Sequence, residues 1–423
     1  MRNITAVILA AGRGTRMKSE RAKVLHRIGD RTILERVIAG LRKSGVKDIV
    51  TVVGHKADEI ERLFSGKIRF VRQPKLIGSG DALKRAVGRL KKDKGLVLVA
   101  CGDTPLITGA TYRRLAQTHL ATKASCTLLT CQMANPASYG RIVRDGNGNI
   151  LKITEEKDAS RSEKKISEIN VGTYCFDADD LRRFIHRIKV NKKKKEFYLT
   201  DIVDVMARNG KKIVSRSCSA DEAVGINSRS DLAMANKMIN RRRIERLMAS
   251  GVTVVDPDTT CVAETAMVGK DTAVFPHTVI EDNVKIGANC KIGPFARLRP
   301  GTRLSRDVEI GNFVEICRTR IGKGTKVKHH AYLGDTTVGR NANIGAGVIT
   351  ANYDGRKKHR TFIGDNASIG VGVSLVAPVR IGKGARVGAG SVVTKNRNVA
   401  AGETVAGVPA KPLQHRRGRK RGQ

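Results

Sequence analysis

Apolar residues recur at every sixth position through the second half of the sequence, and this repeat limits the possible folds more than any other feature. The interval runs from Val262 to Ile344 with two five-residue steps, and it continues from Ile363 to Val393 after the segment NYDGRKKHR. Such a period is the signature of a parallel β-helix, in which three hexads make one triangular coil. Known hexapeptide helices are left-handed, an exception to the usual crossover rule. We therefore predict an all-β left-handed parallel β-helix of hexapeptide repeats over residues 251–410, with about seven coils.

Residues 1–229 alternate strand-like and helix-like segments. The apolar segments ITAVILA, DIVTVVG, IRFVRQ and GLVLVACGD are strand candidates with helical stretches between them. This order predicts a Rossmann-like α/β domain with a mainly parallel sheet. Later strand-like segments, such as SCTLLTCQ and NVGTYCFD, are less regularly spaced and predict an added sheet region around a cleft.

Two further segments complete the predicted organisation. Residues 230–250 carry a partial apolar stripe and are predicted to form a helical linker between the two domains. Residues 411–423 (KPLQHRRGRKRGQ) contain no acid and are predicted to be a basic disordered tail.

The charge balance indicates an anionic ligand. The 423 residues include 80 Lys and Arg against 39 Asp and Glu, which gives a formal net charge of +41. This excess predicts attraction to phosphates and weak, non-specific binding of nucleic acid; a general basic bias is an equal explanation. The eight cysteines have no CxxC spacing, and we find no secretion signal and no apolar stretch of about 18 residues. We therefore expect reduced thiols in a cytoplasmic protein without membrane attachment.

A glycine-rich loop, LAAGRGTRM, directly follows the first predicted strand. Gly12 and Gly14 allow the backbone to approach a ligand, and the N–H groups of such a turn can hold phosphate oxygens. Arg13, Arg16 and Lys23 add positive charge. The loop lacks both the Walker pattern and the GxGxxG spacing, so a simple tight turn is the alternative interpretation.

The string LAAGRGTRM…KVLH resembles the sugar-nucleotide pyrophosphorylase family, and the resemblance continues through RQPKLIGSGDAL, CGDTPLI, NPASYGRIV, ITEEKDA, EINVGTY, KEFYLTD and GIN. It implies catalytic roles for Arg16 and Lys23 and a Mg²⁺ site at Asp103 and Asn227. Leu76 departs from the family, which often has Gln there. The resemblance implies nucleotide and sugar contacts at Leu9, Ala10, Ala11, Gly12, Arg13, Lys23, Gln73, Gly78, Ser79, Asp103, Gly140, Glu155, Asn170 and Asn227.

The residue types suit this chemistry. A sugar-1-phosphate is already an anion at neutral pH, so it can attack the α-phosphorus of a nucleoside triphosphate and expel pyrophosphate without a general base; the resemblance implies that this triphosphate is UTP. The reaction requires alignment and neutralisation of several negative charges. A carboxylate and an amide oxygen are suitable Mg²⁺ ligands. The alternative for Asp103 is a turn cap at the end of a strand.

The strings FARLRPG, NFVEI, HHAYLGD, NIGAG, ITANYDG and KKHRT occur in this order on the repeat. They resemble the C-terminal half of the bifunctional N-acetylglucosamine-1-phosphate uridyltransferase/glucosamine-1-phosphate acetyltransferase family, and with the first half the resemblance covers about residues 3–410. It implies a homotrimer and a general base at His329, whose neutral imidazole suits deprotonation of an amine. It also implies glucosamine-1-phosphate contacts at Arg299, Tyr332, Asn343 and Lys358, and acetyl-CoA contacts at Ala346, Asn352, Tyr353 and Ala389.

Two departures bear on the second activity. Cys317 stands where the family normally has a lysine that binds the sugar phosphate, and Val371 replaces a serine near the coenzyme. We expect a weakened KM for glucosamine-1-phosphate. On a regular strand Arg318 should face away from Cys317, although a local distortion could let it substitute for the missing lysine. His330 should likewise face away from its neighbour His329.

Two other functions remain open at this stage. The chain could be a monofunctional nucleotidyltransferase whose β-helix is a trimerisation scaffold, as Cys317 and Val371 favour. It could also be a regulatory or RNA-associated protein on the same fold, as the net charge of +41 favours. The complete glycine-rich loop and both metal positions oppose the second alternative, and no RNA motif with interleaved aromatic residues is recognisable.

Overall fold

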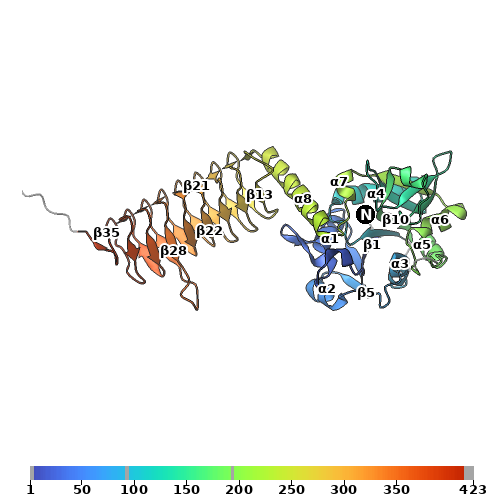
Figure 1. The fold of residues 1–423 in the computed structure, drawn as a ribbon, viewed down its shortest axis with the longest axis horizontal. Helices are drawn as coiled ribbons and strands as arrows, with labels where there is room; N and C mark the ends of the chain where they lie inside the picture. The colour runs from blue at the N-terminus through green and yellow to red at the C-terminus, as the bar shows by residue number, and fades with distance from the viewer. Residues whose placement is uncertain (1–3, 91–94, 192–194, 414–423) are drawn as a thin grey trace, which may run out of the picture. The chain divides into compact units, whose positions relative to one another are not determined.

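The computed structural model describes residues 4–90, 95–191 and 195–413. Within it the chain divides into two compact units, residues 1–238 and 239–423 (Figure 1). No helix of the described residues is long and apolar enough to cross a membrane.

The first unit is built on a mainly parallel sheet, as predicted. Among the described residues the sheet has nine strands, and its main path runs in the order β11-β7-β10-β6-β1-β4-β5. Strand β10 is antiparallel to β6 and β7, and the other neighbours on this path are parallel. The path strands are β1 (Ile4–Ala10), β4 (Asp48–Val53), β5 (Arg69–Arg72), β6 (Leu96–Cys101), β7 (Cys126–Gln132), β10 (Glu168–Asp177) and β11 (Ile213–Ser217); β8 (Arg141–Arg144) and β9 (Ile150–Thr154) form a hairpin beside β10.

Helices cover both faces of this sheet, which explains why its central strand is apolar at successive positions. Ile8 of β1 belongs to the hydrophobic core on one face, and its neighbour Val7 belongs to the core on the other. The first core is closed by α1 (Ile33–Lys43), α2 (Ala57–Phe64), α4 (Gly109–Thr122) and α7 (Ala220–Ala223), and the second by α3 (Ser79–Val87), α5 (Ala178–Ile185) and α6 (Asp201–Arg208).

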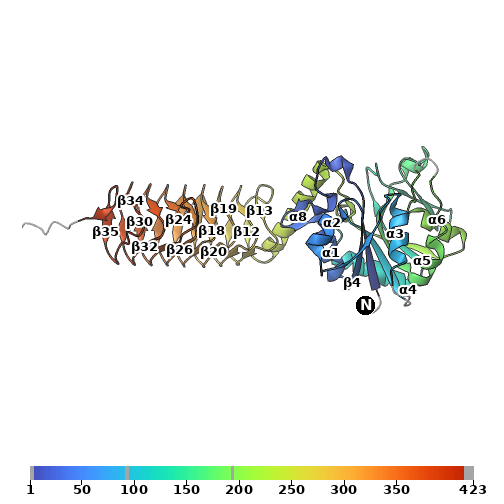
Figure 2. The same ribbon diagram turned by 90° about the horizontal axis from the view of Figure 1, so that it is seen from below.

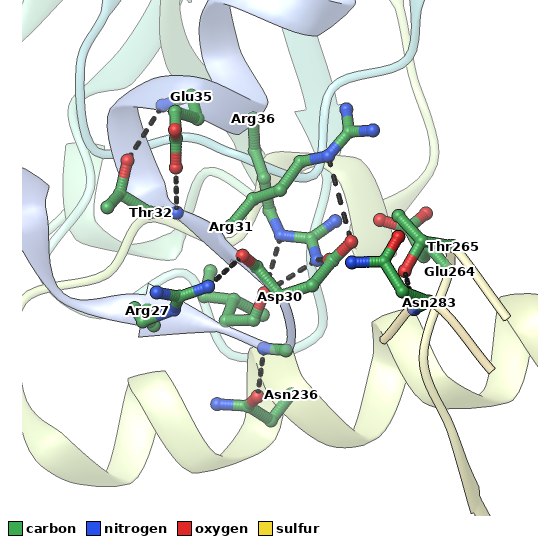
Figure 3. A network of polar contacts seen from close by, with 12 residues as sticks. Arg27, Asp30, Arg31, Thr32, Glu35, Arg36, Asn236, Glu264, Thr265 and Asn283 are labelled. Carbon is green, nitrogen blue, oxygen red and sulfur yellow. Dashed lines mark hydrogen bonds and ion pairs between the residues drawn. The ribbon is translucent and has the colours of Figure 1, made fainter. Parts of the chain in front are cut away.

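A polar network holds the chain between the glycine-rich loop and α1 (Figure 3). Thr32 and Glu35 form a capping box, in which the Glu35 N–H donates to Thr32 Oγ1 at 3.1 Å and the Thr32 N–H donates to Glu35 Oε2 at 2.7 Å. The buried Arg36 donates to a carbonyl of the hairpin formed by β2 (Arg27–Ile28) and β3 (Arg31–Thr32). The Gly29 N–H donates to Asn236 of α8 (Arg229–Ala249), which fixes the hairpin against that helix.

The second unit is a parallel β-helix with three faces, as predicted (Figure 2). The first face, of ten strands among the described residues, contains β12 (Thr253–Val254), β15 (Ala273–Val274), β18 (Lys291–Ile292), β21 (Glu309–Asn312), β24 (Lys326–His329), β27 (Asn343–Ile344), β30 (Ser368–Ile369), β33 (Arg386–Val387), β35 (Thr404–Ala406) and β36 (Lys411–Pro412). The second face contains β13 (Cys261–Val262), β16 (Val279–Ile280), β19 (Arg297–Leu298), β22 (Glu315–Cys317), β25 (Tyr332–Gly334), β28 (Ile349–Ala351), β31 (Ser374–Val376) and β34 (Val392–Val393). The third face contains β14 (Met267–Val268), β17 (Lys285–Ile286), β20 (Arg303–Leu304), β23 (Arg320–Ile321), β26 (Thr336–Val338), β29 (Thr361–Ile363) and β32 (Val379–Ile381).

The repeat residues form the core of the β-helix, and the stack is longer than the sequence indicated. Val274, Ile292 and Ile310 are fully or almost fully buried, one above another on the first face. The core also includes Val254 and Val405, which lie outside the repeat counted from the sequence. Val254 was missed because its step to Val262 is eight residues. Val405 was missed although it keeps the six-residue spacing, two steps beyond Val393 through Val399.

The end of the β-helix extends into the predicted tail. Lys411–Pro412 forms β36, which pairs with β35 in antiparallel fashion, so these two residues are not tail. Leu413 is also held, since its N–H donates to the Thr404 carbonyl at 2.9 Å, and residues 414–423 of the predicted tail lie outside the described residues.

Candidate active sites

The glycine-rich loop leaves the carboxyl end of β1 at the centre of the sheet. Gly14 has φ of +62°, and a Cβ there would lie 2.6 Å from the Cβ of Lys23. A side chain at this position would therefore be strained and would collide with Lys23. A Cβ at Gly12 would meet no atom within 4 Å, so the backbone of this residue faces open space.

A cleft of about 680 Å³ opens beside this loop. It is lined by the loop, the segment after β5 and the end of β6. Of the predicted nucleotide residues, those that line it are Leu9, Ala10, Ala11, Gly12, Arg13, Lys23, Gln73, Gly78, Ser79 and Asp103. Arg16 lies outside this lining, exposed on the short helix η1 (Thr15–Met17). The cleft is also lined by residues that were not predicted from the sequence: Thr15, Val24, Ala82, Cys101 and Glu196.

Lys23, Asp103 and Asn227 meet at one point beside the cleft. Lys23 Nζ lies 2.5 Å from Asp103 Oδ2 and 3.1 Å from Asn227 Oδ1. Asp103 directly follows β6, and the Ile226 N–H donates to the Asp103 carbonyl at 2.8 Å, which aligns the neighbouring Asn227. Asp103 and Asn227 thus each direct a side-chain oxygen at the Lys23 ammonium. Hard oxygen ligands of this kind also fit Mg²⁺.

These two residues would supply a minority of the ligands of an octahedral ion. The described residues contain no group of three or more His, Cys, Asp or Glu side chains that could hold a metal. Mg²⁺ often retains several waters and binds through one or two protein oxygens and substrate phosphates. The pair formed by Asp103 and Asn227 therefore suits a metal that binds together with a nucleotide.

The segment after β5 presents an acceptor to the cleft. Gln73 is buried, and its Nε2 donates to the Gly78 carbonyl at 3.0 Å and to Asp81 Oδ2 at 2.9 Å. Both amide protons are therefore used within the protein, and Oε1 is the atom that Gln73 can offer a ligand. Gly78 has φ of +108°, and a Cβ there would lie 2.3 Å from the Phe197 carbonyl oxygen. A glycine is required at this point.

The predicted sugar residues lie together, outside the lining of the cleft. A Cβ on Gly140 would lie 3.7 Å from both Glu155 Oε2 and Asn170 Cβ, and the Asn170 N–H donates to the Gly140 carbonyl at 2.8 Å. Burial raises the pKa of Glu155, whose Oε1 accepts from Thr200 Oγ1 at 3.0 Å. Thr200 and Tyr174, whose side chains hold this group, were not singled out as site residues from the sequence, although both lie within strings of the resemblance (KEFYLTD and EINVGTY).

The predicted acetyltransferase residues fall on two edges of the second face of the β-helix. The first edge carries His329, Ala346 and Ala389, with Asn343 on the adjoining first face. His329 is exposed at the end of β24, where it pairs with Asn312 of the preceding coil. The Gly372 N–H donates to the Ala346 carbonyl at 2.7 Å, and such bonds stack the coils along this edge.

The second edge carries Arg299, Asn352, Tyr353 and Lys358, and it is reached by the hydroxyl of Tyr332, the first residue of β25. Arg299 Nη1 lies 2.7 Å from Glu315 Oε1, and Tyr353 and Lys358 form an antiparallel bridge. A Cβ on Gly334 would lie 2.6 Å from the Tyr332 hydroxyl and 2.7 Å from Asn352 Nδ2. The Tyr332 hydroxyl and the Asn352 amide therefore lie directly over the backbone of Gly334, which has no side chain.

Arg318 does not face away from Cys317, contrary to expectation. Its φ of +49° ends the strand at Cys317 and turns the side chain back. Arg318 Nη1 lies 2.8 Å from the sulfur of the buried Cys317, while Nε and Nη2 pair with the two oxygens of Asp335 at 2.6 and 2.7 Å. The bond from Arg318 lowers the pKa of Asp335. The local distortion thus places a guanidinium beside Cys317.

His330 likewise leaves the strand. Its φ is +42°, so the strict alternation assumed from the sequence does not apply. The His330 ring stacks on Phe313 with a centroid separation of 5.0 Å. This contact ends a column of stacked rings at one corner of the β-helix, formed by His277, Phe295, Phe313 and His330.

Comparison with known proteins finds relatives of both units. The family model for the MobA-like NTP transferase domain matches residues 6–164, and the model for the bacterial transferase hexapeptide matches residues 265–300, 283–318 and 360–395. The bifunctional protein GlmU of Pelotomaculum thermopropionicum is 45% identical over 411 residues, covering 89% of this chain and 90% of that protein. The bifunctional proteins GlmU of Geobacillus sp. (strain WCH70) and Carboxydothermus hydrogenoformans are 41% and 40% identical, each covering 92% of this chain and 92% and 95% of their own lengths. The chain therefore belongs to the GlmU family of bifunctional proteins.

Proposed function

We propose that the chain carries out the last two steps of UDP-N-acetylglucosamine synthesis. The second unit transfers an acetyl group from acetyl-CoA to glucosamine-1-phosphate, and the first unit then transfers a uridylyl group from UTP to the product and releases pyrophosphate. The observation that carries the proposal is the meeting of Lys23, Asp103 and Asn227 beside an open glycine-rich loop. Membership of the GlmU family supports the same assignment.

In the first unit, the chain's own groups neutralise and align two anions. The exposed backbone around Gly12 and the side chains of Arg13 and Lys23 bind the triphosphate. The Oε1 atom of Gln73 accepts from a ring N–H of the base, which uracil provides. Gly140, Glu155 and Asn170 hold the sugar, so that its phosphate oxygen attacks the α-phosphorus. Mg²⁺ held by Asp103 and Asn227 would supply further neutralisation of phosphate charge.

In the second unit, the reaction needs a general base and cationic side chains that bind the sugar phosphate. His329 accepts a proton from the glucosamine nitrogen, which attacks the thioester carbonyl carbon, and the C–S bond breaks to release coenzyme A. Arg299 and Lys358 bind the phosphate, while Tyr332 and Asn343 contact the sugar. Ala346, Asn352, Tyr353 and Ala389 contact acetyl-CoA.

A product assay tests both activities. The protein is incubated with UTP, Mg²⁺ and N-acetylglucosamine-1-phosphate, and separately with acetyl-CoA and glucosamine-1-phosphate. We expect UDP-N-acetylglucosamine with pyrophosphate in the first assay, and N-acetylglucosamine-1-phosphate with coenzyme A in the second. Product in the first assay alone would favour the monofunctional enzyme with a scaffold β-helix. Product in neither would favour the regulatory or RNA-associated alternative.

We expect the protein to be a homotrimer, because one β-helix separates the parts of the acetyltransferase site. His329 lies on one edge of the second face and Arg299 and Lys358 belong to the other, with a strand of about 10 Å between the edges. In glucosamine-1-phosphate the amine and the phosphate are on adjacent ring carbons. A second copy would bring the two edges together between neighbouring chains. Light scattering at micromolar concentration should give three times the chain mass, and a monomer that acetylates efficiently would contradict the prediction.

We also expect weak, salt-sensitive binding of nucleic acid without sequence preference. Lys285, Arg303 and Arg320 stack in register on the third face, all exposed, and none has a carboxylate partner within the described part of the chain. Three phosphate contacts give a slope of log K against log salt of about −3. Replacing Arg303 and Arg320 with Gln should reduce that slope by about two in a filter-binding titration. The tail residues Arg416, Arg417, Arg419, Lys420 and Arg421, also expected to contribute, lie outside the described residues.

A further inference from the structure

Lys23 occupies the position that a metal ion would need. Its Nζ lies 2.5 Å from Asp103 Oδ2 and 3.1 Å from Asn227 Oδ1, the two oxygens that fit Mg²⁺. Mg²⁺ binds oxygen at about 2.0–2.1 Å, so it would share the same small volume. An ammonium group and a divalent cation at such a separation also repel each other strongly. Bonding of Lys23 to these two oxygens therefore competes with metal binding through them.

The surroundings limit where the Lys23 side chain can go. The turn at Gly14 lies against its stem, because a Cβ on Gly14 would be 2.6 Å from Lys23 Cβ and 3.3 Å from Cγ and Cδ. Lys23 also begins the short helix η2 (Lys23–Leu25), in which the Lys23 carbonyl accepts from the His26 N–H at 3.2 Å. The backbone and the stem are thus held, and the terminal ammonium is the part that can move.

Lys23 also lines the cleft that the triphosphate would enter. Without a nucleotide, Asp103 is its partner, and the side chains of Lys23 and Asp103 are 13% and 26% exposed. A triphosphate would provide several new anionic oxygens within reach of the same ammonium. Its arrival would offer Lys23 another partner and release both oxygen ligands to the metal.

We propose that Lys23 closes the metal site of the nucleotide-free protein and opens it when a triphosphate binds. This inference rests on the proposed function, because it takes Asp103 and Asn227 as the metal ligands. It adds an order of events: the metal enters with the nucleotide, and the protein alone has a weak affinity for it. Lys23 is then a positioning residue for the metal as well as a phosphate ligand.

The test measures Mn²⁺ binding to the full chain without nucleotide, by the loss of the EPR signal of free Mn²⁺. Lys23→Met keeps much of the stem and removes the charge. We expect its Mn²⁺ affinity to be about threefold to fivefold higher than that of the wild type, the range for loss of a partly exposed ion pair. Lys23→Gln serves if the methionine variant fails to fold, as judged by circular dichroism.

Arg13→Met is the matched control, since it removes a cation from the same cleft that makes no contact with Asp103 or Asn227. An equal gain in affinity for Arg13→Met would mean that general charge explains the effect and would overturn the inference. Asp103→Ala separates a failure of the Lys23 inference from a failure of the metal assignment. If Asp103→Ala weakens Mn²⁺ binding but Lys23→Met changes nothing, this inference is wrong and the metal site stands. If Asp103→Ala leaves Mn²⁺ binding unchanged, the metal assignment itself is wrong.

Discussion

Replacing Asp103 with alanine is expected to abolish uridylyl transfer and to leave acetyl transfer intact. The substitution removes the carboxylate that bonds to Lys23 and that would bind Mg²⁺. Loss of several kcal/mol of charge stabilisation at the transferring phosphoryl group corresponds to a fall in kcat/KM of at least about 100-fold. Acetyl transfer should persist because His329, Arg299 and Lys358 belong to the separately compact second unit.

The measurement follows pyrophosphate release and coenzyme A release from one preparation of the variant. Asp221→Ala is a suitable control, because Asp221 is an exposed carboxylate of the same unit, on α7. Its uridylyl transfer should match the wild type. Normal uridylyl transfer by Asp103→Ala would show that the metal assignment is wrong, and loss of both activities with a lowered Tm would show that the variant is misfolded.

The architecture of the second unit could be predicted because it follows a period that burial imposes. Side chains alternate across a strand, so one apolar residue in each hexad is enough to mark the interior of a three-sided coil. Ile292 and its neighbours in the stack obey that period. Val254 does not, because the first coil has an irregular connection of eight residues to Val262. Periodicity therefore predicts the middle of such a stack better than its ends.

The contacts within the nucleotide site required the fold. Lys23 is 80 residues from Asp103 and 204 from Asn227 along the chain. The strings of the resemblance placed all three in one site, but they do not indicate which atoms touch. The contact follows from the sheet order: β1 and β6 are neighbours, so the loop after one and the carboxylate after the other meet at the same edge. The bond between Ile226 and Asp103 then adds Asn227.

Arg318 shows where strand alternation fails as a guide. A regular strand would direct it away from Cys317, but a positive φ at this corner reverses its direction. Nothing in the local sequence EICRT requires that conformation. It is supported by the next coil, where Asp335 accepts two bonds from the guanidinium. Backbone geometry at a corner thus depends on a partner 17 residues away.

The missing lysine at position 317 should consequently matter less than the sequence indicated. We expect Arg318→Met to raise the KM for glucosamine-1-phosphate by about tenfold or more, the effect of losing a charge-assisted bond of about 1.5–3 kcal/mol. Loss of the guanidinium also leaves Asp335 without its ion-pair partner, and the carboxylate would repel the phosphate. The kcat should fall less than kcat/KM, because His329 is unchanged. Cys317→Lys should change the KM by less than about threefold, since Arg318 already places a cation there.

Steady-state kinetics of coenzyme A release, with glucosamine-1-phosphate varied, decides between these expectations. Arg340→Met is the matched control, because Arg340 also pairs with an aspartate of a neighbouring coil, Asp365, at a different corner of the β-helix from Cys317 and Arg318. It should leave the KM unchanged. If Cys317→Lys instead lowers the KM tenfold while Arg318→Met has no effect, the guanidinium is committed to Asp335 and does not bind the substrate. The chain would then be a weak acetyltransferase because it lacks a lysine at position 317. A trimerisation scaffold would become the better explanation for its β-helix.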